Sequence, residues 1–348
     1  MQTVTVKQLE QFIQRCLTAV GMSERSARIT AELMSEADLN GSDGHGVFRL
    51  PQYVKRIRSG GINVAPNIRV ATDKGAMALV NGDDAMGHLV MRYATDLAIE
   101  KAAEQGVGWV GVQHSNHAGP AALYAKMPMQ RDMIGIYVAV GSANHLPPWG
   151  GTELLLSTNP IAVGVPAYEE PPIVLDMATT VAAYGKVKTA AQRGEQMPEG
   201  WMMDKFGKPL TDPTRAAEGF LLPIGGAKGY GLALVFGLLA GTLNGAAFGR
   251  EVVDFNADSR SSTNTGQFIV ALSIEAFMDV DQFKRNVDGV IRSMHASPTL
   301  PGVDAVRVPG ERSHRIRLER EKNGIPIHPG LAQQLDELAR GLATEALL

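Results

Sequence analysis

The first sixty residues place apolar side chains at the spacing of amphipathic helices. Thr5 and Gln8 form a capping-box pattern, which predicts that a helix starts at this point. Its apolar face would consist of Leu9, Phe12, Ile13, Leu17 and Val20. Similar spacing predicts further helices over about 23–39 and about 45–60. Residues 1–70 are therefore predicted to form an N-terminal helical lobe.

From about residue 68 the pattern changes to short apolar runs that are typical of strands. Helical stretches near 89–105 and 119–130 alternate with these runs. The predicted strands are 77–80, 107–112, 134–140, 160–166, 173–175 and, later, 266–274. Residues 71–315 are therefore predicted to form a mixed α/β region.

Three further stretches differ from this alternation. Residues 189–214 are rich in glycine, proline and charge, which predicts an extended loop. Residues 230–245 are the most apolar stretch, but glycines interrupt it. It falls short of the roughly 18 uninterrupted apolar residues that a membrane span needs, so we expect a buried helix. Leucines between 331 and 342 share one helical face, so residues 316–348 are expected to pack on the helical lobe or on a partner subunit.

Composition narrows the class of protein. The chain has 348 residues, of which 45% are hydrophobic, and its net charge of −3 is spread over interspersed acids and bases. This balance disfavours nucleic-acid binding. The first seventeen residues lack the apolar core of a signal peptide, so we expect a cytoplasmic protein without a membrane partner. The chain has a single cysteine, Cys16, so an internal disulfide is excluded. Cys16 falls on the apolar face of the first predicted helix, which indicates a core residue.

Two glycine clusters bear on nucleotide binding. The run from Gly106 to Gly111 matches the G-x-G-x-x-G pattern, but a predicted helix precedes it and a predicted strand follows. The Rossmann fingerprint requires the opposite order, because a helix N-terminus must face the pyrophosphate. We therefore interpret these glycines as a helix end and a strand start. The run from Gly225 to Gly231 precedes a helix and includes Lys228, which suits a phosphate better.

The segment from Asp43 to Arg49 holds the first candidate for catalysis. His45 and Arg49 are four residues apart, so on the opening turn of a helix both would project from one face. An imidazole exchanges a proton near neutral pH, and a guanidinium binds a carboxylate through two hydrogen bonds. Together they fit a 2-oxo acid site in which Arg49 holds the carboxylate and His45 protonates the carbonyl oxygen. On spacing alone, an ordinary polar pair on a helix surface is the favoured interpretation.

Other polar segments lie close to predicted strands. Residues 114–117 include two histidines, but no cysteine or acid lies nearby in the sequence to complete a zinc site, so no metal is expected. Thr158 in a turn and Asp176 at a helix start have ordinary structural explanations, and Lys186 equally fits an exposed helix position. Further candidates for the lining of a pocket are Phe48, Tyr53, His145 and Trp149.

Taken in order, these motifs resemble one family, the malate/L-lactate dehydrogenase-like oxidoreductases. That family includes malate, sulfolactate and ureidoglycolate dehydrogenases, diketogulonate reductase, and reductases of cyclic imines such as piperideine-2-carboxylate. The matching blocks span residues 38–315 and are specific only in combination. They are Asp43-Gly44-His45-Gly46-Val47 with Arg49, Ser115-Asn116-His117, Pro148-Trp149-Gly150-Gly151, Thr158-Asn159-Pro160-Ile161-Ala162, Leu175-Asp176-Met177-Ala178-Thr179, Gly185-Lys186, Gly225-Gly226-Ala227-Lys228-Gly229-Tyr230-Gly231 and Pro309-Gly310-Glu311-Arg312.

The resemblance implies an α/β chain with a non-Rossmann malate/L-lactate dehydrogenase-like fold, in which a helical lobe joins a mixed α/β NAD(P)-binding domain. It also implies a homodimer with the active site near the subunit interface, and a small carboxylic acid as substrate. Residues 71–315 would then bind both cofactor and substrate.

The same resemblance implies roles for individual residues. His45 would be the proton donor, with His117 as the rival acid/base and Lys186 as a further catalytic residue. The substrate would be bordered by Arg49, Thr158, Tyr184 and Gly185. The cofactor, NAD or NADP, would be bound by His117, Ala118, Gly119, Pro120, Ala121, Ser142, Asp176, Met177, Ala178, Lys228, Pro309, Gly310, Glu311 and Arg312.

Two positions depart from the family pattern. The family commonly has a serine immediately before the catalytic histidine, and here Gly44 stands in its place. Asp43 or another group would then have to orient His45. The imine-reducing members carry an aspartate where this chain has Lys186, which favours hydroxy-acid chemistry.

We therefore expect an oxidoreductase that interconverts a small 2-oxo acid and its 2-hydroxy acid, of the malate, lactate or sulfolactate type. Reduction of a cyclic imine is one alternative. A relative that binds NAD(P) or a metabolite without catalysis is another. The sequence leaves the choice between NAD and NADP open, because no Rossmann strand ends in an acid that would read the ribose.

Overall fold

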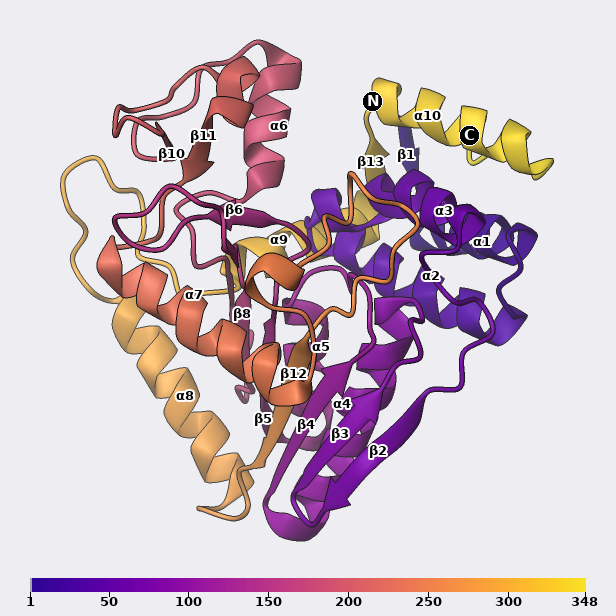
Figure 1. The fold of residues 1–348 in the computed structure, drawn as a ribbon. Coiled ribbons are helices and arrows are strands. Elements are labelled where there is room, and N and C mark those ends of the chain that lie inside the picture. The colour runs from indigo at the N-terminus through magenta and orange to yellow at the C-terminus, as the bar shows by residue number, and fades with distance from the viewer. Residues whose placement is uncertain (1) are drawn as a thin grey trace.

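The computed structural model describes residues 2–348, apart from the side chain of Gln192. Residue 1 of the predicted helical lobe lies outside that range. Figure 1 shows a central sheet with helices along its faces, and a further group of helices beside one end of the sheet, where the two chain termini lie close together.

The N-terminal helices follow the predicted pattern. They are α1 (Val6–Ala19), α2 (Glu24–Leu39) and α3 (Leu50–Ser59). At the start of α1, the Thr5 hydroxyl accepts from the Gln8 amide, and the Gln8 side chain accepts from the Thr5 amide. The predicted capping box is therefore confirmed. The side chains that α1 buries are Leu9, Phe12, Ile13, Cys16 and Leu17.

The third helix begins later than the spacing predicts. Residues 43–49 form two short 3-10 turns that meet at Gly46, where ψ is −135°. The Asp38 side chain explains why the helix does not start earlier. Its carboxylate accepts a hydrogen bond from the Val47 amide at 2.7 Å and occupies the space that a Cβ at position 46 would need. The two turns are Asp43–His45 and Val47–Arg49. His45 and Arg49 therefore do not share a helix face, and the predicted geometry of this pair is wrong.

Within residues 2–348, the centre of the fold is a seven-stranded mixed sheet. Its strands, in spatial order, are β2 (Arg69–Lys74), β3 (Met77–Asn81), β4 (Val107–Gln113), β12 (Gln267–Ser273), β5 (Met133–Ala139), β8 (Ile161–Val165) and β9 (Ile173–Met177). β3 and β4 are parallel, and the other neighbouring strands of this sheet are antiparallel. A Rossmann domain has a mostly parallel sheet, so the predicted non-Rossmann α/β fold is confirmed.

The glycine-rich run before β4 has the role that its order predicts. α4 (Gly87–Gln105) ends at Gly106, whose φ of +81° is a left-handed helix cap. β4 starts at the next residue. A helix therefore leads into a strand, and no helix N-terminus follows the glycines to face a pyrophosphate.

Helices cover both faces of the sheet (Figure 1). Along β12, Ile269 and Ala271 join a core with α4 and with α5 (Ala122–Lys126). Phe268 and Val270 belong to a second core, which α7 (Ala227–Ala240) closes. This alternation is that of a strand buried on both faces. α5 is shorter than the helix predicted over 119–130, and a 3-10 turn, Pro128–Arg131, follows it.

The end of the chain returns to the N-terminal helices. The elements after β12 are α8 (Val280–His295), α9 (Glu311–Asn323), β13 (Ile325–Ile327) and α10 (Pro329–Leu342). β13 pairs antiparallel with β1 (Gln2–Val4). The buried side chains of α10 join the same apolar core as those of α1. The division of the chain into domains at residue 70 stays a prediction.

The extended loop predicted over 189–214 is wrong. α6 (Tyr184–Arg193) runs through its first residues, and β10 (Met202–Asp204) pairs with β11 (Gly219–Leu221). Figure 1 shows these elements as a small lobe beyond the end of the main sheet. The core of this lobe consists of Val187, Ala190, Met197, Met202, Leu210, Ala216 and Leu221. Because these apolar residues are dispersed among glycine, proline and charge, composition alone conceals the core.

The prediction of a buried helix over 230–245 is wrong in one respect. The helix, α7, is present, but one of its faces is exposed. Leu232, Val235 and Leu238 are exposed. The residues that α7 buries are small, namely Gly229, Ala233, Gly237 and Ala240. This small face lets the helix lie close to its neighbours. Phe236 and Leu239 are partly buried against the same core, so only some of the large apolar side chains point outward. Nowhere in residues 2–348 is a helix long and apolar enough to cross a membrane.

Candidate active site

A cluster of rings from distant segments forms the centre of the site. His45 lies in the first 3-10 turn, and His117 follows β4. Their rings stack with centroids 5.6 Å apart and with 15° between the planes. Tyr53 of α3 also contacts His117, with 2.6 Å between its hydroxyl oxygen and Nδ1. The structure therefore brings together the two histidines that the sequence nominates as rival acid/base groups.

A close backbone contact places His117 against the start of α4. A Cβ at Gly87 would lie 2.1 Å from the carbonyl oxygen of Asn116 and 2.6 Å from that of His117, so only glycine fits. The next residue, His88, is fully buried, with its ring edge-on to Tyr53 at a centroid distance of 5.6 Å. Neither ring nitrogen of His88 has a hydrogen-bond partner within the described chain. The sequence analysis missed His88, because a histidine next to an apolar run carries no motif.

Two groups approach the same nitrogen of His117. The Tyr53 hydroxyl lies 2.6 Å and the Gly119 backbone nitrogen 3.4 Å from Nδ1. A backbone amide can only donate, so Nδ1 acts as an acceptor and the proton of neutral His117 resides on Nε2. Burial raises the pKa of Tyr53, which keeps its hydroxyl protonated and able to donate. The tautomer of His117 therefore follows from its two neighbours.

Burial controls the charge of all three histidines. It lowers the pKa of His45 to about 4, with a further contribution from the positive charge of Arg49. Burial also lowers the pKa of His88 to about 3 and holds the pKa of His117 well below its ordinary value. The three rings are therefore neutral at pH 7. In the protein without substrate, His45 is a base and not the imidazolium that proton donation requires.

Loop residues hold the Arg49 side chain. Its Nε donates to the carbonyl oxygen of Gly44 at 2.9 Å, and its Nη1 donates to Oδ1 of Asn256 at 3.1 Å. Arg49 is half-buried, which lowers its pKa, yet a guanidinium stays charged at any physiological pH. Asn256 was not among the predicted residues, because it is 207 residues away in an irregular stretch without a motif.

Asp43 does not orient His45. Both oxygens of its carboxylate pair with Arg320 of α9, and Arg320 also donates to the carbonyl oxygen of Asp38. The idea that Asp43 substitutes for the missing serine is therefore wrong, because its carboxylate anchors the turn to α9. Position 44 itself is open, since no atom lies within 4 Å of a Cβ built on Gly44.

Three of the predicted cofactor segments meet at β9, the edge strand of the sheet. Asp176 accepts the Ala122 amide at 2.9 Å, which joins β9 to the end of the 117–121 stretch. The Val174 amide donates to the carbonyl oxygen of Pro309 at 3.0 Å. The structure therefore brings together the stretches around positions 119, 177 and 310. We refer to this region as the β9 edge.

The other predicted cofactor residues lie outside that contact. Lys228 is exposed in the first turn of α7 and follows two glycines with positive φ. The carbonyl oxygen of Ser142 accepts the Phe255 amide at 2.9 Å. Glu311 pairs with His295 of α8, and Arg312 is exposed. In the described chain, Lys228 and Ser142 make no hydrogen bond to the β9 edge.

Apart from Arg49, the predicted substrate residues lie just after β7 and at the start of α6. Thr158 follows β7 (Leu156–Ser157), and its carbonyl oxygen accepts from both the amide and the hydroxyl of Thr179 at 2.9 Å. β7 pairs with β6 (Asn144–Leu146), where His145 stacks on the Tyr184 ring with centroids 4.0 Å apart. β6 therefore connects the Thr158 region to the first residue of α6.

The next two residues of α6 lie at the surface. Gly185 and Lys186 are exposed, and the Lys186 ammonium lies 6.0 Å from the centroid of the Trp201 ring. Phe48 and Trp149, which the sequence nominates for the pocket lining, are exposed as well. These positions thus have more solvent contact than the ring cluster.

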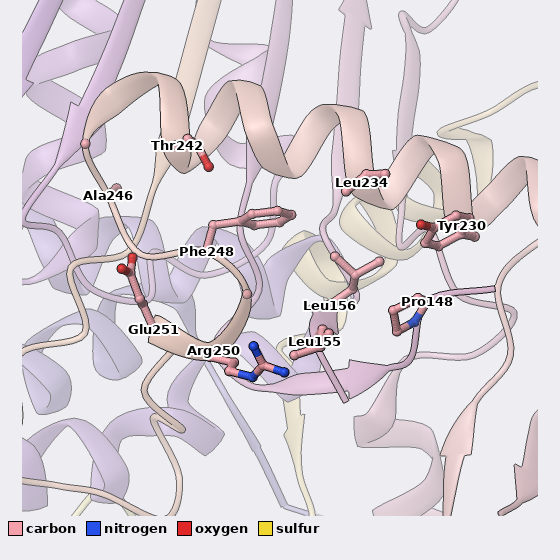
Figure 2. A pocket seen from close by; sticks show the side chains of 12 residues that line it. Pro148, Leu155, Leu156, Tyr230, Leu234, Thr242, Ala246, Phe248, Arg250 and Glu251 are labelled. Atoms are coloured by element: carbon pink, nitrogen blue, oxygen red, sulfur yellow. The ribbon is translucent and has the colours of Figure 1, made fainter. Parts of the chain in front are cut away.

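Figure 2 shows an apolar groove beside α7 that is separate from the predicted site residues. It is lined by Pro148, Leu155, Leu156, Tyr230, Leu234, Thr242, Gly245, Ala246, Phe248, Gly249, Arg250 and Glu251. None of the residues predicted for catalysis, substrate or cofactor belongs to this lining. Across residues 2–348, no three His, Cys, Asp or Glu side chains are grouped to hold a metal ion.

Comparison with known proteins identifies the family. The family model for malate/L-lactate dehydrogenase matches residues 4–336. The chain is 39% identical over 342 residues to the malate/(S)-sulfolactate dehydrogenase of Methanothermus fervidus, and this match covers 98% of each chain. It is 32% identical to a Delta(1)-pyrroline-2-carboxylate/Delta(1)-piperideine-2-carboxylate reductase of Pseudomonas putida, with 96% of each chain covered.

A solved structure agrees in fold as well as in sequence. The sulfolactate dehydrogenase of Methanocaldococcus jannaschii superimposes with a TM-score of 0.91 at 36% identity, covering 99% of this chain and 98% of the other. The resemblance and the fold expected from the motifs are confirmed. The chain therefore belongs to the malate/L-lactate dehydrogenase family and is an NAD(P)-dependent oxidoreductase of the 2-hydroxy-acid dehydrogenase type.

Proposed function

We propose that this protein interconverts a small 2-oxo acid and its 2-hydroxy acid, with His45 as the acid/base and Arg49 as the ligand of the substrate carboxylate. The observation that carries the proposal is the half-buried cluster in which His45 stacks on His117 close to Arg49. When a carbonyl group is reduced, negative charge develops on its oxygen and must be neutralised by a proton. The relative named for malate and sulfolactate supports this substrate class.

The chemistry of the β9 edge and of Lys228 fits a nicotinamide dinucleotide. Burial raises the pKa of Asp176 to about 6, so at pH 7 it is mostly a carboxylate that can accept hydrogen bonds from ribose hydroxyls. Lys228 is an exposed cation beside a helix N-terminus, which suits a pyrophosphate. When bound, the nicotinamide supplies the hydride chemistry. The residues that would hold it are His117, Ala118, Gly119, Pro120, Ala121, Ser142, Asp176, Met177, Ala178, Lys228, Pro309, Gly310, Glu311 and Arg312. Whether NAD or NADP is preferred is for the assay below to determine.

The proton passes through His45 in both directions. As a neutral base, His45 accepts the hydroxyl proton when a 2-hydroxy acid is oxidised. A substrate carboxylate on Arg49 offsets the positive charge that helps to lower the pKa of His45, and it adds a negative charge nearby. Substrate binding therefore raises the pKa of His45, which allows it to carry a proton for reduction.

His117 has a different part in this proposal. Because Nδ1 accepts from its neighbours, His117 presents Nε2–H as a donor, which can orient a carbonyl oxygen without giving up its proton. Thr158, Tyr184 and Gly185 would border the substrate, and Lys186 stays a predicted catalytic residue.

The test is absorbance of the reduced nicotinamide, with NADH and NADPH in parallel, across pyruvate, oxaloacetate, sulfopyruvate and diketogulonate. We expect turnover of at least one oxo acid, and a kcat lower by on the order of a thousandfold in His45→Ala. The control His328→Asn replaces an exposed cap residue of α10 and should keep full activity. Near-normal kcat in His45→Ala with its loss in His117→Ala would transfer the acid/base role to His117. Cofactor binding without turnover of any oxo acid would overturn the proposal.

Reduction of a cyclic imine is the second candidate function. It is favoured by the similarity to the reductase of Pseudomonas putida that is named for two cyclic imine carboxylates. The same assay with piperideine-2-carboxylate separates the two. Activity on the imine with none on the oxo acids would favour this candidate.

We also propose a cytoplasmic homodimer. The outward face of α7 supports the dimer, because Leu232, Val235 and Leu238 are large apolar side chains that a monomer would leave in water. Light scattering that gives twice the mass of the chain would support this assembly, and a monomeric mass would contradict it.

A further inference from the structure

Residues 255–265 form an irregular segment that crosses the site between α3 and the loop after β4. We refer to it as the crossing segment. On the α3 side, the residues that contact it are spaced so that they share one helical face. They are Arg49, Gln52, Tyr53 and Arg56.

Arg56 makes the most extensive of these contacts. It is fully buried, although arginine is rarely buried without partners. Its Nη1 donates to the carbonyl oxygen of Asp258, and its Nη2 donates to those of Ser261 at 2.7 Å and Gly61 at 3.3 Å. The guanidinium also lies 4.8 Å from the centroid of the Phe255 ring. Nε of Arg56 is buried without a hydrogen-bond partner in the described chain, so the carbonyl groups at Nη1 and Nη2 are what offset the unfavourable burial of this cation.

The backbone geometry around Arg56 leaves little freedom. A Cβ at Gly61 would lie 2.5 Å from the carbonyl oxygen of Ser259 and 2.8 Å from Nη2 of Arg56. One turn of α3 earlier, Gln52 donates to the carbonyl oxygen of Phe255 at 2.8 Å. The crossing segment is therefore fixed to α3 over most of its length.

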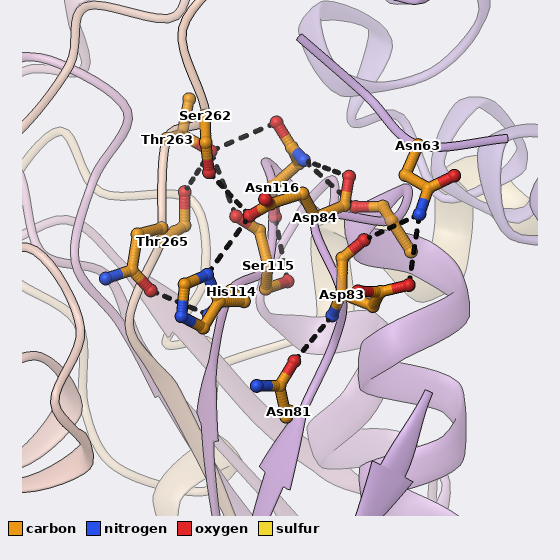
Figure 3. A network of polar contacts seen from close by, with 12 residues as sticks. Asn63, Asn81, Asp83, Asp84, His114, Ser115, Asn116, Ser262, Thr263 and Thr265 are labelled. Atoms are coloured by element: carbon orange, nitrogen blue, oxygen red, sulfur yellow. Dashed lines mark hydrogen bonds and ion pairs between the residues drawn. The ribbon is translucent and has the colours of Figure 1, made fainter. Parts of the chain in front are cut away.

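The far end of the crossing segment is held by the loop that carries His117 (Figure 3). The Thr263 hydroxyl donates to the carbonyl oxygen of Ser115 at 2.9 Å and to Oδ1 of Asn116 at 3.0 Å. The Thr265 amide donates to the same Ser115 oxygen at 2.9 Å. His117 is the next residue of that loop, so the crossing segment ties α3 to His117.

The start of the crossing segment touches both sides of the site. Asn256 accepts from Nη1 of Arg49 at 3.1 Å. The ring of Phe255 lies 5.4 Å from that of His117 and 5.7 Å from that of Tyr53, centroid to centroid. Any shift of the segment therefore moves the partner of Arg49 and the packing of His117 together.

We infer that Arg56 is a positioning residue, which fixes the crossing segment so that Asn256 holds the Arg49 guanidinium at the substrate carboxylate. Arg56 itself touches neither substrate nor cofactor. The inference rests on the proposed role of Arg49. It predicts that loss of Arg56 weakens substrate binding more than cofactor binding, because among the proposed cofactor residues the crossing segment contacts only Ser142 and His117 and shares no hydrogen bond with the β9 edge in the described chain.

The experiment compares Arg56→Met and Arg56→Lys with wild type. Arg56→Lys keeps the charge but lacks the fork that reaches Asp258 and Ser261 together, and it serves if Arg56→Met does not fold. We expect KM for the oxo acid to rise on the order of tenfold or more, with kcat less affected and with the Kd of NADH or NADPH changing less than KM. Arg58→Met, an exposed arginine of the same helix, is the control and should leave KM unchanged. A lower melting temperature with unchanged KM in both Arg56 variants would overturn the inference.

A double-variant comparison with Asn256 provides a second measurement. A purely structural role of Arg56 would not make the effects of the two substitutions on KM depend on each other. Asn256→Ala should raise KM by itself. If Arg56 acts through Asn256, the double variant Arg56→Lys with Asn256→Ala should show a KM close to that of the weaker-binding single variant. Effects that multiply would overturn the inference.

Arg49→Lys separates this inference from the proposed function. If Arg49→Lys leaves KM for the oxo acid unchanged, the proposed role of Arg49 fails, and the inference fails with it. If Arg49→Lys raises KM but both Arg56 variants leave it unchanged, only the inference fails.

Discussion

The ring cluster and the β9 edge are built in opposite ways. In the cluster, rings from several distant segments pack together, and burial lowers the pKa of His45, His88 and His117. At the β9 edge, strand and loops meet mainly through backbone groups, Arg312 stays exposed, and burial of the carboxyl group raises the pKa of Asp176 to about 6. The difference teaches that loss of water keeps the histidines of the cluster neutral at pH 7, whereas the Asp176 carboxylate at the β9 edge stays mostly charged at that pH although burial raises its pKa.

The largest expected effect tests the cluster through His88. The pKa of His88 is about 3 in the folded protein and about 6.5 in an unfolded chain. Below pH 6.5 the unfolded chain therefore takes up a proton that the folded chain refuses. The contribution of neutral His88 to the free energy of unfolding is therefore full above pH 6.5 and is lost as the pH falls from 6.5 toward 3. Between pH 7 and pH 5, wild type should lose on the order of 2 kcal/mol more unfolding free energy than His88→Gln.

Urea denaturation at pH 7, 6 and 5 measures this difference. His328→Asn, at an exposed position, is the control and should follow wild type. Equal losses of unfolding free energy in wild type and His88→Gln would mean that solvent reaches His88 in the native state. The ring cluster would then not differ from the β9 edge in the way described above.

The next effect tests the β9 edge. Asp176→Asn removes a negative charge but keeps an oxygen for the Ala122 amide. We expect the Kd of the dinucleotide to rise about tenfold, because hydrogen bonds to a charged group are stronger than those to an amide. KM for the oxo acid, measured at saturating cofactor, should not change. Fluorescence titration and steady-state kinetics give the two constants, with the surface variant Asp96→Asn as control. A change in KM alone would show that the two regions are not separable.

The smallest effect concerns the open position before His45. Gly44→Ser adds a hydroxyl where no atom lies within 4 Å, so the protein should fold normally. If the hydroxyl orients His45, kcat should rise by a few-fold at most, since one exposed hydrogen bond contributes about 1 kcal/mol. Gly341→Ser adds a side chain at an equally open position of α10 and should leave kcat unchanged. A large loss of kcat would instead mean that the turn needs glycine at position 44.

Local patterns predicted much of the fold, and long-range contacts explain most of what they missed. The capping box of α1 and the strand that follows Gly106 depend on neighbours in sequence, and both were predicted correctly. The core of the small lobe depends on apolar residues far apart in the chain, so composition indicated a loop. The buried face of α7 consists of glycine and alanine, which a count of apolar residues does not single out.

The same limit applies to the site. His45 and Arg49 were nominated from their spacing on a helix, but the structure brings them together by two turns that the Asp38 carboxylate separates. Asn256 and Arg56 had no signal in the sequence. One lies in an irregular stretch, and the other resembles any basic residue of an amphipathic helix. Which of the nominated residues act in catalysis stays a prediction until the variants are measured.

The pairing of β1 with β13 has a consequence for how the protein is made. Residues 2–4 leave the ribosome more than 300 residues before their partner strand, 325–327, is synthesised. Arg320, which anchors Asp43, comes equally late. The turn that carries His45 therefore reaches its final support only after α9 has been synthesised. A nascent chain can build the central sheet before that, but it holds no finished site.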